Sequence, residues 1–195
     1  MVARGSLENP GTGALNSLVE LITKRHLEAT IHAFRYPAGL EHYQQSVAAG
    51  TQAVTRQLTS YVRRCPNSQV VVLGYSQGAH VTGDALCGGK AIDTEDFTPP
   101  LDDDISSRIA AIVWYGDPRH VAGKPFNKGN ATTDGIFARK EGQSCDKFSD
   151  ILASYCDDGD MFCANRGSDY MVHMTYPERY DAQAADFVLD RLPMK

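Results

Sequence analysis

A run of aliphatic residues at positions 70–73 leads directly into the sequence Gly-Tyr-Ser-Gln-Gly at positions 74–78. An unbroken β-branched and aliphatic run of this kind is typical of a strand buried on both faces of a parallel sheet. Downstream, apolar residues recur at helical spacing over positions 79–86, until Cys-Gly-Gly interrupts the pattern. The pattern therefore predicts a strand, a sharp turn at Ser76 and a helix in succession.

The rest of the chain alternates between strand-like and helix-like patterns in the same way. Residues 29–39 alternate in polarity and end in Pro-Ala-Gly, which predicts a strand. Residues 43–66 place their apolar side chains on one side of a helix that the final proline ends, residues 109–118 predict a further strand, and residues 181–192 predict a last helix. This order predicts an α/β fold with a parallel sheet. The acidic, proline-containing stretch at 93–104 is interpreted as a solvated connection.

Length and composition indicate a single domain over residues 1–195. The chain has 195 residues, of which 42% are hydrophobic, enough for a sizeable core without a metal ion or a second subunit, so we expect a monomer. The formal net charge is −5, and no basic cluster is larger than Arg63-Arg64. No apolar run approaches the length of a membrane span. These features argue against nucleic-acid binding and against a transmembrane segment.

The five cysteines form no Cys-x-x-Cys pair, which argues against a zinc site of the common spacings. Disulfide bonds in an exported protein account for them better. The sequon Asn130-Ala131-Thr132 is consistent with a secreted, extracellular protein. The residues after Met1 contain no apolar signal-peptide core, so we expect either a trimmed mature form or a misplaced start.

The candidate nucleophile is Ser76, because Gly-x-Ser-x-Gly between a strand and a helix is the context of a nucleophile elbow. Glycine is needed at positions 74 and 78, since a β-carbon there would meet the neighbouring strand or helix. The serine needs a histidine to take its proton and a carboxylate to orient that histidine. His120 follows Asp117 by only three residues, too close for both side chains to converge on Ser76. His173 precedes the last helix, in a loop where the last connection would reach the sheet, and is the predicted base.

Candidates for the acid lie within Cys-Asp-Asp-Gly-Asp-Met-Phe-Cys at 156–163, and they are Asp157, Asp158 and Asp160. A disulfide between the two flanking cysteines would close an eight-residue ring and fix the shape of this loop. Rigid placement is what an orienting carboxylate requires. Gly159 permits the tight backbone that turns the next side chain inward, so we predict Asp160.

Together these residues resemble the cutinases and acetylxylan esterases of fungi and actinobacteria. The resemblance rests on motifs that occur in order along nearly the whole chain: ARGS at 3–6, YPA at 36–38, CP at 65–66, GYSQGA at 74–79, GDP at 116–118, YCDDGDMFC at 155–163, and His173. It implies a three-layer α/β-hydrolase-like fold with a central, mainly parallel sheet and no large lid. It also implies Ser76, Asp160 and His173 as the catalytic triad. Ser6 and Gln77 would form the oxyanion hole, which agrees with the need for backbone N–H donors at the developing negative charge.

The cysteines show where the chain departs from this family. Its members carry an opening strand and a cysteine ahead of ARGS, and this sequence begins too late to include either, so Cys65 is left without its usual partner. The resemblance implies a bond between Cys156 and Cys163. It also implies a bond between Cys87 and Cys145, as in the acetylxylan esterase branch.

The expected chemistry is hydrolysis of carboxylic esters through an acyl-enzyme on Ser76, without a metal ion or an organic cofactor. The resemblance implies that the substrate is an ester in a polyester or an acylated polysaccharide. Apolar side chains near His173, among them Phe162 and Met171, favour a cutinase-like esterase for short to medium acyl chains, whereas interspersed charges such as Arg166 keep an acetylxylan esterase as the alternative. A non-catalytic secreted binding protein on the same scaffold is a further alternative, against which the complete triad argues.

Overall fold

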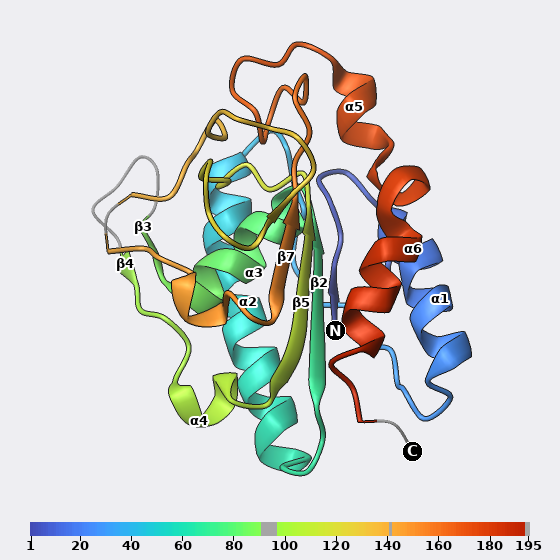
Figure 1. Ribbon diagram of the computed structural model, residues 1–195. Helices are drawn as coiled ribbons and strands as arrows, with labels where there is room; N and C mark the ends of the chain where they lie inside the picture. Colours follow the sequence, from blue (N-terminus) through green and yellow to red (C-terminus); the bar gives the residue numbers. More distant parts are fainter. Residues whose placement is uncertain (91–96, 141, 194–195) are drawn as a thin grey trace.

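A five-stranded parallel sheet forms the centre of the computed structural model, which describes residues 1–90, 97–140 and 142–193 (Figure 1). The strand order is β1-β2-β5-β7-β6, and every neighbouring pair in it is parallel. The strands are β1 (Val2–Ala3), β2 (Val70–Tyr75), β5 (Ile109–Tyr115), β6 (Asn127–Lys128) and β7 (Leu152–Tyr155). A separate antiparallel pair joins β3 (Gly89–Lys90) to β4 (Phe97–Thr98). Part of the acidic connection, residues 93–96, lies outside the described residues.

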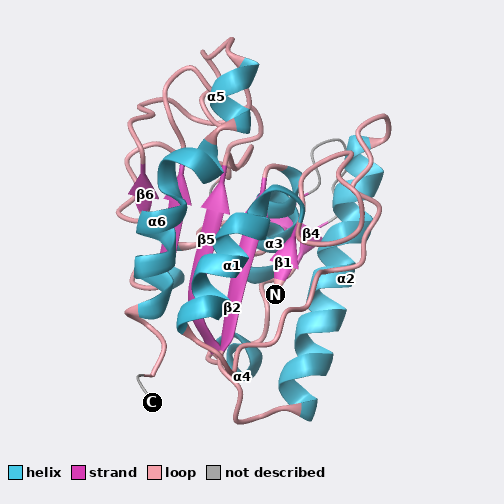
Figure 2. Cartoon of the chain, turned by 90° about the vertical axis from the view of Figure 1, so that its right-hand side faces the viewer, coloured by secondary structure: helices cyan, strands magenta, loops and turns pink. Residues whose placement is uncertain are grey.

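Helices cover both faces of the sheet, which confirms the predicted three-layer arrangement. Figures 1 and 2 show α1 (Asn16–Arg25) and α6 (Tyr176–Leu189) on one face and α2 (Tyr43–Arg64) and α3 (Gln77–Cys87) on the other. Short helical segments complete the fold: η1 (Gly13–Leu15), α4 (Asp103–Ser106), η2 (Asp146–Phe148) and α5 (Tyr170–Met174). None of the described helices combines the length and the apolar character that crossing a bilayer requires.

The side chains of β5 divide the core into two halves. Ile112 and Trp114 are buried in the cluster beneath α2 and α3, whereas Val113 and Tyr115 are buried in the cluster beneath α1 and α6. Successive residues of a strand point to opposite faces, so a strand covered on both sides must be apolar throughout. The uninterrupted aliphatic run of β2 has the same cause, and the sequence predicted both strands for this reason.

The predicted strand at residues 29–39 is wrong except for one contact. Only Ala33 forms a bridge, to Val2, through the hydrogen bonds Val2 N to His32 O (2.9 Å) and Phe34 N to Val2 O (2.8 Å). The adjacent strand β1 has only two residues, so it cannot support a longer ladder. We expected no strand ahead of the ARGS motif, but Val2–Ala3 form β1, which pairs in parallel with β2.

The last helix also differs from its prediction. It begins at Tyr176, five residues before the expected start at 181, and ends at Leu189. Pro177 lies in its first turn, where a helix tolerates the missing N–H of proline. His173 lies in the short helix α5 and not in a loop.

The cysteines pair as the resemblance implied. Cys87 at the end of α3 is bonded to Cys145, 58 residues away, and Cys156 is bonded to Cys163, 7 residues away. Cys65 is a free, half-buried thiol.

The two disulfides should contribute unequally to stability. The chain-entropy relation predicts that losing the longer loop costs about 4 kcal/mol in the free energy of unfolding and losing the shorter one about 2.5 kcal/mol. The double variant Cys87→Ala/Cys145→Ala should therefore unfold at a lower urea concentration than Cys156→Ala/Cys163→Ala. Equal midpoints, or the reverse order, would contradict this interpretation. Cys65→Ala is the control and should unfold close to the wild type.

Candidate active site

Ser76 lies at a strained turn between β2 and α3. Its backbone has φ 53° and ψ −118°, values that a residue with a side chain rarely adopts. A β-carbon on Gly78 would lie 2.0 Å from the carbonyl oxygen of Ala3, and one on Gly74 would lie 2.8 Å from the backbone of Ala79. The glycines are therefore needed for the steric reason predicted from the sequence. The turn leaves Ser76 half-buried at the end of the sheet.

The structure brings Ser76, His173 and Asp160 into one chain of hydrogen bonds. His173 Nε2 lies 2.9 Å from Ser76 Oγ, and His173 Nδ1 lies 2.8 Å from Asp160 Oδ2. The three residues come from the start of α3, from α5 and from the loop between Cys156 and Cys163. Both histidine nitrogens are engaged in the way a serine nucleophile requires, with one facing the hydroxyl and the other the carboxylate.

Asp160 is fully buried, and four hydrogen-bond donors surround it. Its Oδ1 accepts from the backbone N–H groups of Phe162 (2.7 Å) and Cys163 (3.1 Å), and its Oδ2 accepts from the Tyr176 hydroxyl (2.8 Å) and from His173. Burial raises the pKa of Asp160, but His173 and the two backbone donors together hold it below its ordinary value. The buried carboxylate is thus kept ionised. The backbone of the loop between Cys156 and Cys163 fixes its orientation.

The ring of His173 is held by aromatic side chains. Tyr75 stacks on it with centroids 5.3 Å apart, and Phe162 meets it edge-on at 4.6 Å. The Tyr75 hydroxyl donates to the carbonyl oxygen of His173 at 3.1 Å. Gly116 closes the other side, because a β-carbon there would lie 2.6 Å from His173 Cε1. The imidazole is therefore fixed both in its plane and in its position.

The side chain of Gln77 connects the proposed oxyanion segments. Its Nε2 donates to Ser6 Oγ (3.1 Å) and to the carbonyl oxygen of Gly39 (2.8 Å), and its Oε1 accepts from Ser46 Oγ (2.8 Å). Within the described part of the chain, neither the Ser6 nor the Gln77 backbone N–H donates to another group. The two amides that were expected to bind an oxyanion are thus fixed in place and available.

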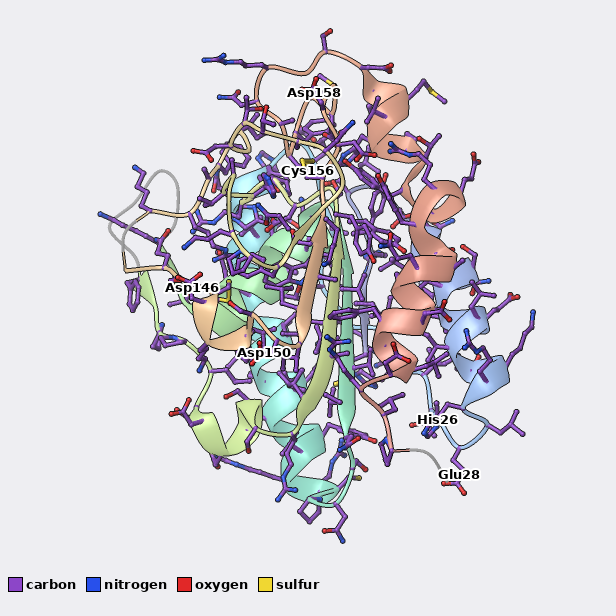
Figure 3. All side chains as sticks on the ribbon, in the orientation of Figure 1. His26, Glu28, Asp146, Asp150, Cys156 and Asp158 are labelled. Atoms are coloured by element: carbon purple, nitrogen blue, oxygen red, sulfur yellow. A yellow bond between two sulfur atoms is a disulfide. The ribbon has the colours of Figure 1, made fainter. Side chains whose placement is uncertain are left out.

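Among the described contacts, the remaining acid and base candidates form no hydrogen bond with Ser76 or His173. Asp157 forms an ion pair with Arg179 and accepts from the Tyr180 hydroxyl, whereas Asp158 is exposed. Figure 3 shows Asp158 in the loops above the sheet, beyond Cys156. Asp117 accepts from the backbone N–H of Arg119 at 2.9 Å. The ring nitrogens of His120 are buried and make no hydrogen bond to any described residue.

Sequence reasoning missed the aromatic supports of the site. Tyr176 contacts Asp160, and burial, followed by the charge of Asp160, raises the pKa of its hydroxyl, which keeps it a donor. A signal was available for Tyr75, because it is the second residue of the nucleophile motif. Tyr176 follows His173 by three residues at the start of a helix, and nothing in the local pattern marks it as a partner of Asp160.

A family model described as Cutinase matches residues 1–192. The chain belongs to the cutinase family. An acetylxylan esterase from Hypocrea jecorina is 36% identical over 97% of this chain, and Cutinase 11 from Verticillium dahliae is 35% identical over 97% of it. The chain spans 65% of the first relative's length and 67% of the second's.

Solved structures of the cutinase family share the fold. The catalytic core domain of acetyl xylan esterase from Trichoderma reesei gives a TM-score of 0.90 at 35% identity, over 98% of this chain and 96% of that one. A Trichoderma reesei cutinase in complex with a phosphonate inhibitor gives a TM-score of 0.68 at 23% identity, over 99% of this chain and 77% of that one. The match to this second structure concerns the fold alone.

Replacement of Asp160 tests whether it, and not another aspartate of the loop between Cys156 and Cys163, orients His173. Asp160→Asn keeps the shape of the side chain but favours the wrong histidine tautomer, so turnover of a soluble ester should fall roughly ten-thousandfold. Asp158→Asn, an exposed change of the same kind in the same ring, is the matched control and should leave turnover near normal. Similar turnover in the two variants would mean that Asp160 is not the orienting acid. Hydrolysis of a chromogenic acetate ester provides the measurement.

Proposed function

We propose that this chain is a serine esterase that hydrolyses carboxylic esters through an acyl-enzyme on Ser76. The observation that supports the proposal best is the chain of hydrogen bonds from Ser76 through His173 to Asp160, at 2.9 and 2.8 Å, with the serine on an elbow. A non-catalytic binding protein would have no need for a buried carboxylate that four donors orient toward an imidazole. Membership of the cutinase family supports the same conclusion.

The geometry allows each step of acyl transfer. Ser76 Oγ attacks the ester carbonyl while His173 Nε2 takes its proton, and Asp160 stabilises the imidazolium that forms. The negative oxygen of the tetrahedral intermediate accepts hydrogen bonds from the backbone N–H groups of Ser6 and Gln77. His173 then gives its proton to the alcohol, which leaves an acyl-Ser76. Water then attacks this ester while His173 takes a proton from it, and His173 returns that proton to Ser76 Oγ as the carboxylic acid is released.

The names of the relatives support a short acyl group, with acetyl as the first choice, as the group that is hydrolysed. An acetylxylan esterase from Hypocrea jecorina is 36% identical to this chain, and the catalytic core domain of acetyl xylan esterase from Trichoderma reesei gives a TM-score of 0.90 at 35% identity. We therefore propose acetyl esters on a plant polysaccharide ahead of the cutin-like esters that the sequence favoured.

Longer apolar esters are the second candidate, because exposed apolar side chains flank the site residues in sequence. Leu7 follows Ser6, Leu40 follows Gly39, and Met171 precedes His173 in α5; their exposed fractions are 73%, 52% and 62%. Large exposed apolar side chains gathered around a site are typical of a surface that meets a hydrophobic partner. A cutinase-like substrate would contact these three side chains, Leu7, Leu40 and Met171, which are called the apolar rim below.

The protein is proposed to act outside the cell as a monomer with one domain over residues 1–195. The two disulfides support an oxidising location. All three residues of the triad come from one chain, so a second copy is not needed to complete the site. Nor does any step of the proposed reaction use a metal ion or an organic cofactor.

Covalent labelling tests the proposed nucleophile. A fluorophosphonate probe should label the wild type and fail to label Ser76→Ala, because only an activated serine hydroxyl forms the phosphonyl ester. Ser107→Ala, at an exposed serine outside the site, is the control and should label like the wild type. Peptide mapping locates the label, and its appearance on another serine would overturn the mechanism.

The acyl-chain preference separates the two substrate candidates. If the acetyl proposal is right, kcat/KM should be highest for acetyl esters and decline as the acyl chain lengthens, and acetylated xylan should release acetate. A rise in kcat/KM toward longer chains would favour the cutinase-like candidate. The exposed change Leu40→Ser would then lower kcat/KM for the long esters alone, since only these reach the apolar rim.

A further inference from the structure

The hydroxyl of Tyr176 extends the chain of hydrogen bonds beyond the triad, at the end away from Ser76. It donates to Asp160 Oδ2 at 2.8 Å, and His173 Nδ1 lies 2.8 Å from the same oxygen. The backbone N–H groups of Phe162 and Cys163 donate to the other oxygen, Oδ1. Tyr176 and His173 therefore share one carboxylate oxygen.

The surroundings of Tyr176 direct its proton to Asp160. The side chain is fully buried, and the backbone N–H of Asp157 donates to its hydroxyl oxygen at 3.0 Å. The other atom nearby, Cys163 Sγ at 3.2 Å, is a much weaker acceptor than a carboxylate. Burial, followed by the charge of Asp160, raises the pKa of the Tyr176 hydroxyl, so it keeps its proton over the whole range in which an esterase works.

The other ionisable groups nearby do not replace this contact. Asp157 is paired with Arg179, whose guanidinium carbon lies 4.8 Å from the centre of the Tyr176 ring, so these two charges oppose each other. Among the described contacts, no further ionisable side chain donates to the Asp160 carboxylate. Those that lie beside Asp160, His173 or Tyr176, or within reach of the charge of Asp160, are Tyr75 from β2, Tyr115 from β5, His120 beyond β5, Asp169 before α5 and Tyr180 from α6.

A donor on Oδ2 weakens the interaction between Asp160 and a protonated His173. The carboxylate favours the imidazolium because opposite charges attract across their short contact. The Tyr176 hydroxyl competes for the negative charge of the same oxygen, so less of it acts on the imidazolium.

We infer that Tyr176 is a positioning residue that, through Asp160, lowers the affinity of His173 for protons. The inference rests on the proposed esterase mechanism, in which His173 must be unprotonated to accept the proton of Ser76. Its consequence is that ester hydrolysis continues to a lower pH than the triad alone would permit.

Removal of the hydroxyl should narrow the active pH range from the acid side. Tyr176→Phe keeps the ring and loses the donor, so Asp160 should bind the imidazolium more strongly. The acid limb of kcat/KM for a soluble acetate ester should move to higher pH by about half a unit or more, a fraction of the effect of one hydrogen bond to a charged group. Above that limb, kcat/KM should fall about tenfold or less, because His173 and the two backbone donors still orient the carboxylate.

Tyr115→Phe is the matched control. Tyr115 is equally buried, stacks on Tyr176 with ring centroids 5.9 Å apart, and donates to a different carboxylate of α6, Asp181 Oδ1, at 2.9 Å. Both variants lose a buried hydrogen bond, so both should have a lower Tm. Only Tyr176→Phe should move the acid limb.

Nitrogen NMR of labelled histidine separates this inference from the proposed function, because it needs no substrate. The signals of His173 are those missing from the spectrum of His173→Asn. In Tyr176→Phe the His173 ring should take up its proton at a higher pH than in the wild type. A wild type without esterase activity would end the proposed function, and the NMR titration would still decide the role of Tyr176.

A variant with a stronger donor gives the opposite test and serves if Tyr176→Phe does not fold. Incorporation of 3-fluorotyrosine at position 176 keeps the hydroxyl and makes it more acidic, so both the acid limb and the NMR titration should move to lower pH. A uniform loss of rate without displacement of the limb would overturn the inference and leave Tyr176 a purely structural role. Displacement in the opposite direction, or an equal displacement in Tyr115→Phe, would also overturn it.

Discussion

The backbone turn at Ser76 is the constraint on which the rest of the structure depends. A residue with a side chain is held at φ 53° there, and this conformation is strained unless its surroundings enforce it. The enforcement comes from both sides, because β2 is fixed between β1 and β5 and α3 packs closely on the backbone of Ala3 through Gly78. The apolar core on both faces of β5 thus supports a turn that would not persist in isolation.

The carboxylate is positioned by a different device. Asp160 lies in a loop, where backbone geometry is normally variable, and the bond between Cys156 and Cys163 restricts that loop to one short ring. The ring directs two backbone N–H groups at Oδ1, and Tyr176 and His173 then meet Oδ2. The rigid strand-to-helix turn and the rigid ring come from distant parts of the sequence, and the imidazole of His173 spans the space between them.

The sequence predicted the parts of the fold that obey local rules. The buried strands β2 and β5 were evident because apolar residues must fill both faces, and α2 was evident from its apolar stripe and from Pro66 beyond its end. The short strands β6 and β7 and helix α1 were missed. Asn127 and Lys128 of β6 carry no strand pattern, and β7 includes Ser154, which breaks an apolar run. The predicted strand at 29–39 failed for a long-range reason, because only Ala33 pairs with β1, through Val2.

The site was more predictable from its motifs than from its surroundings. Ser76 and the choice between Asp158 and Asp160 followed from turn chemistry, and His173 from its place in the chain order. The contacts of Tyr176 with Asp160 depend on how α6 packs beside the Cys156–Cys163 loop, which no local pattern encodes.

The amide group of Gln77 has a consequence for how the segments beside Ser76 can vary. One side chain holds Ser6, Gly39 and Ser46, so three segments that are far apart in the chain share a single fastening point. A shape change in any one of them loosens the other two and moves the Ser6 amide. Residues 161–174 form no such link to Gln77 among the described contacts. Side chains at 161–174 can therefore be exchanged without altering the contacts of Gln77, whereas a change at Ser6, Gly39 or Ser46 alters them directly.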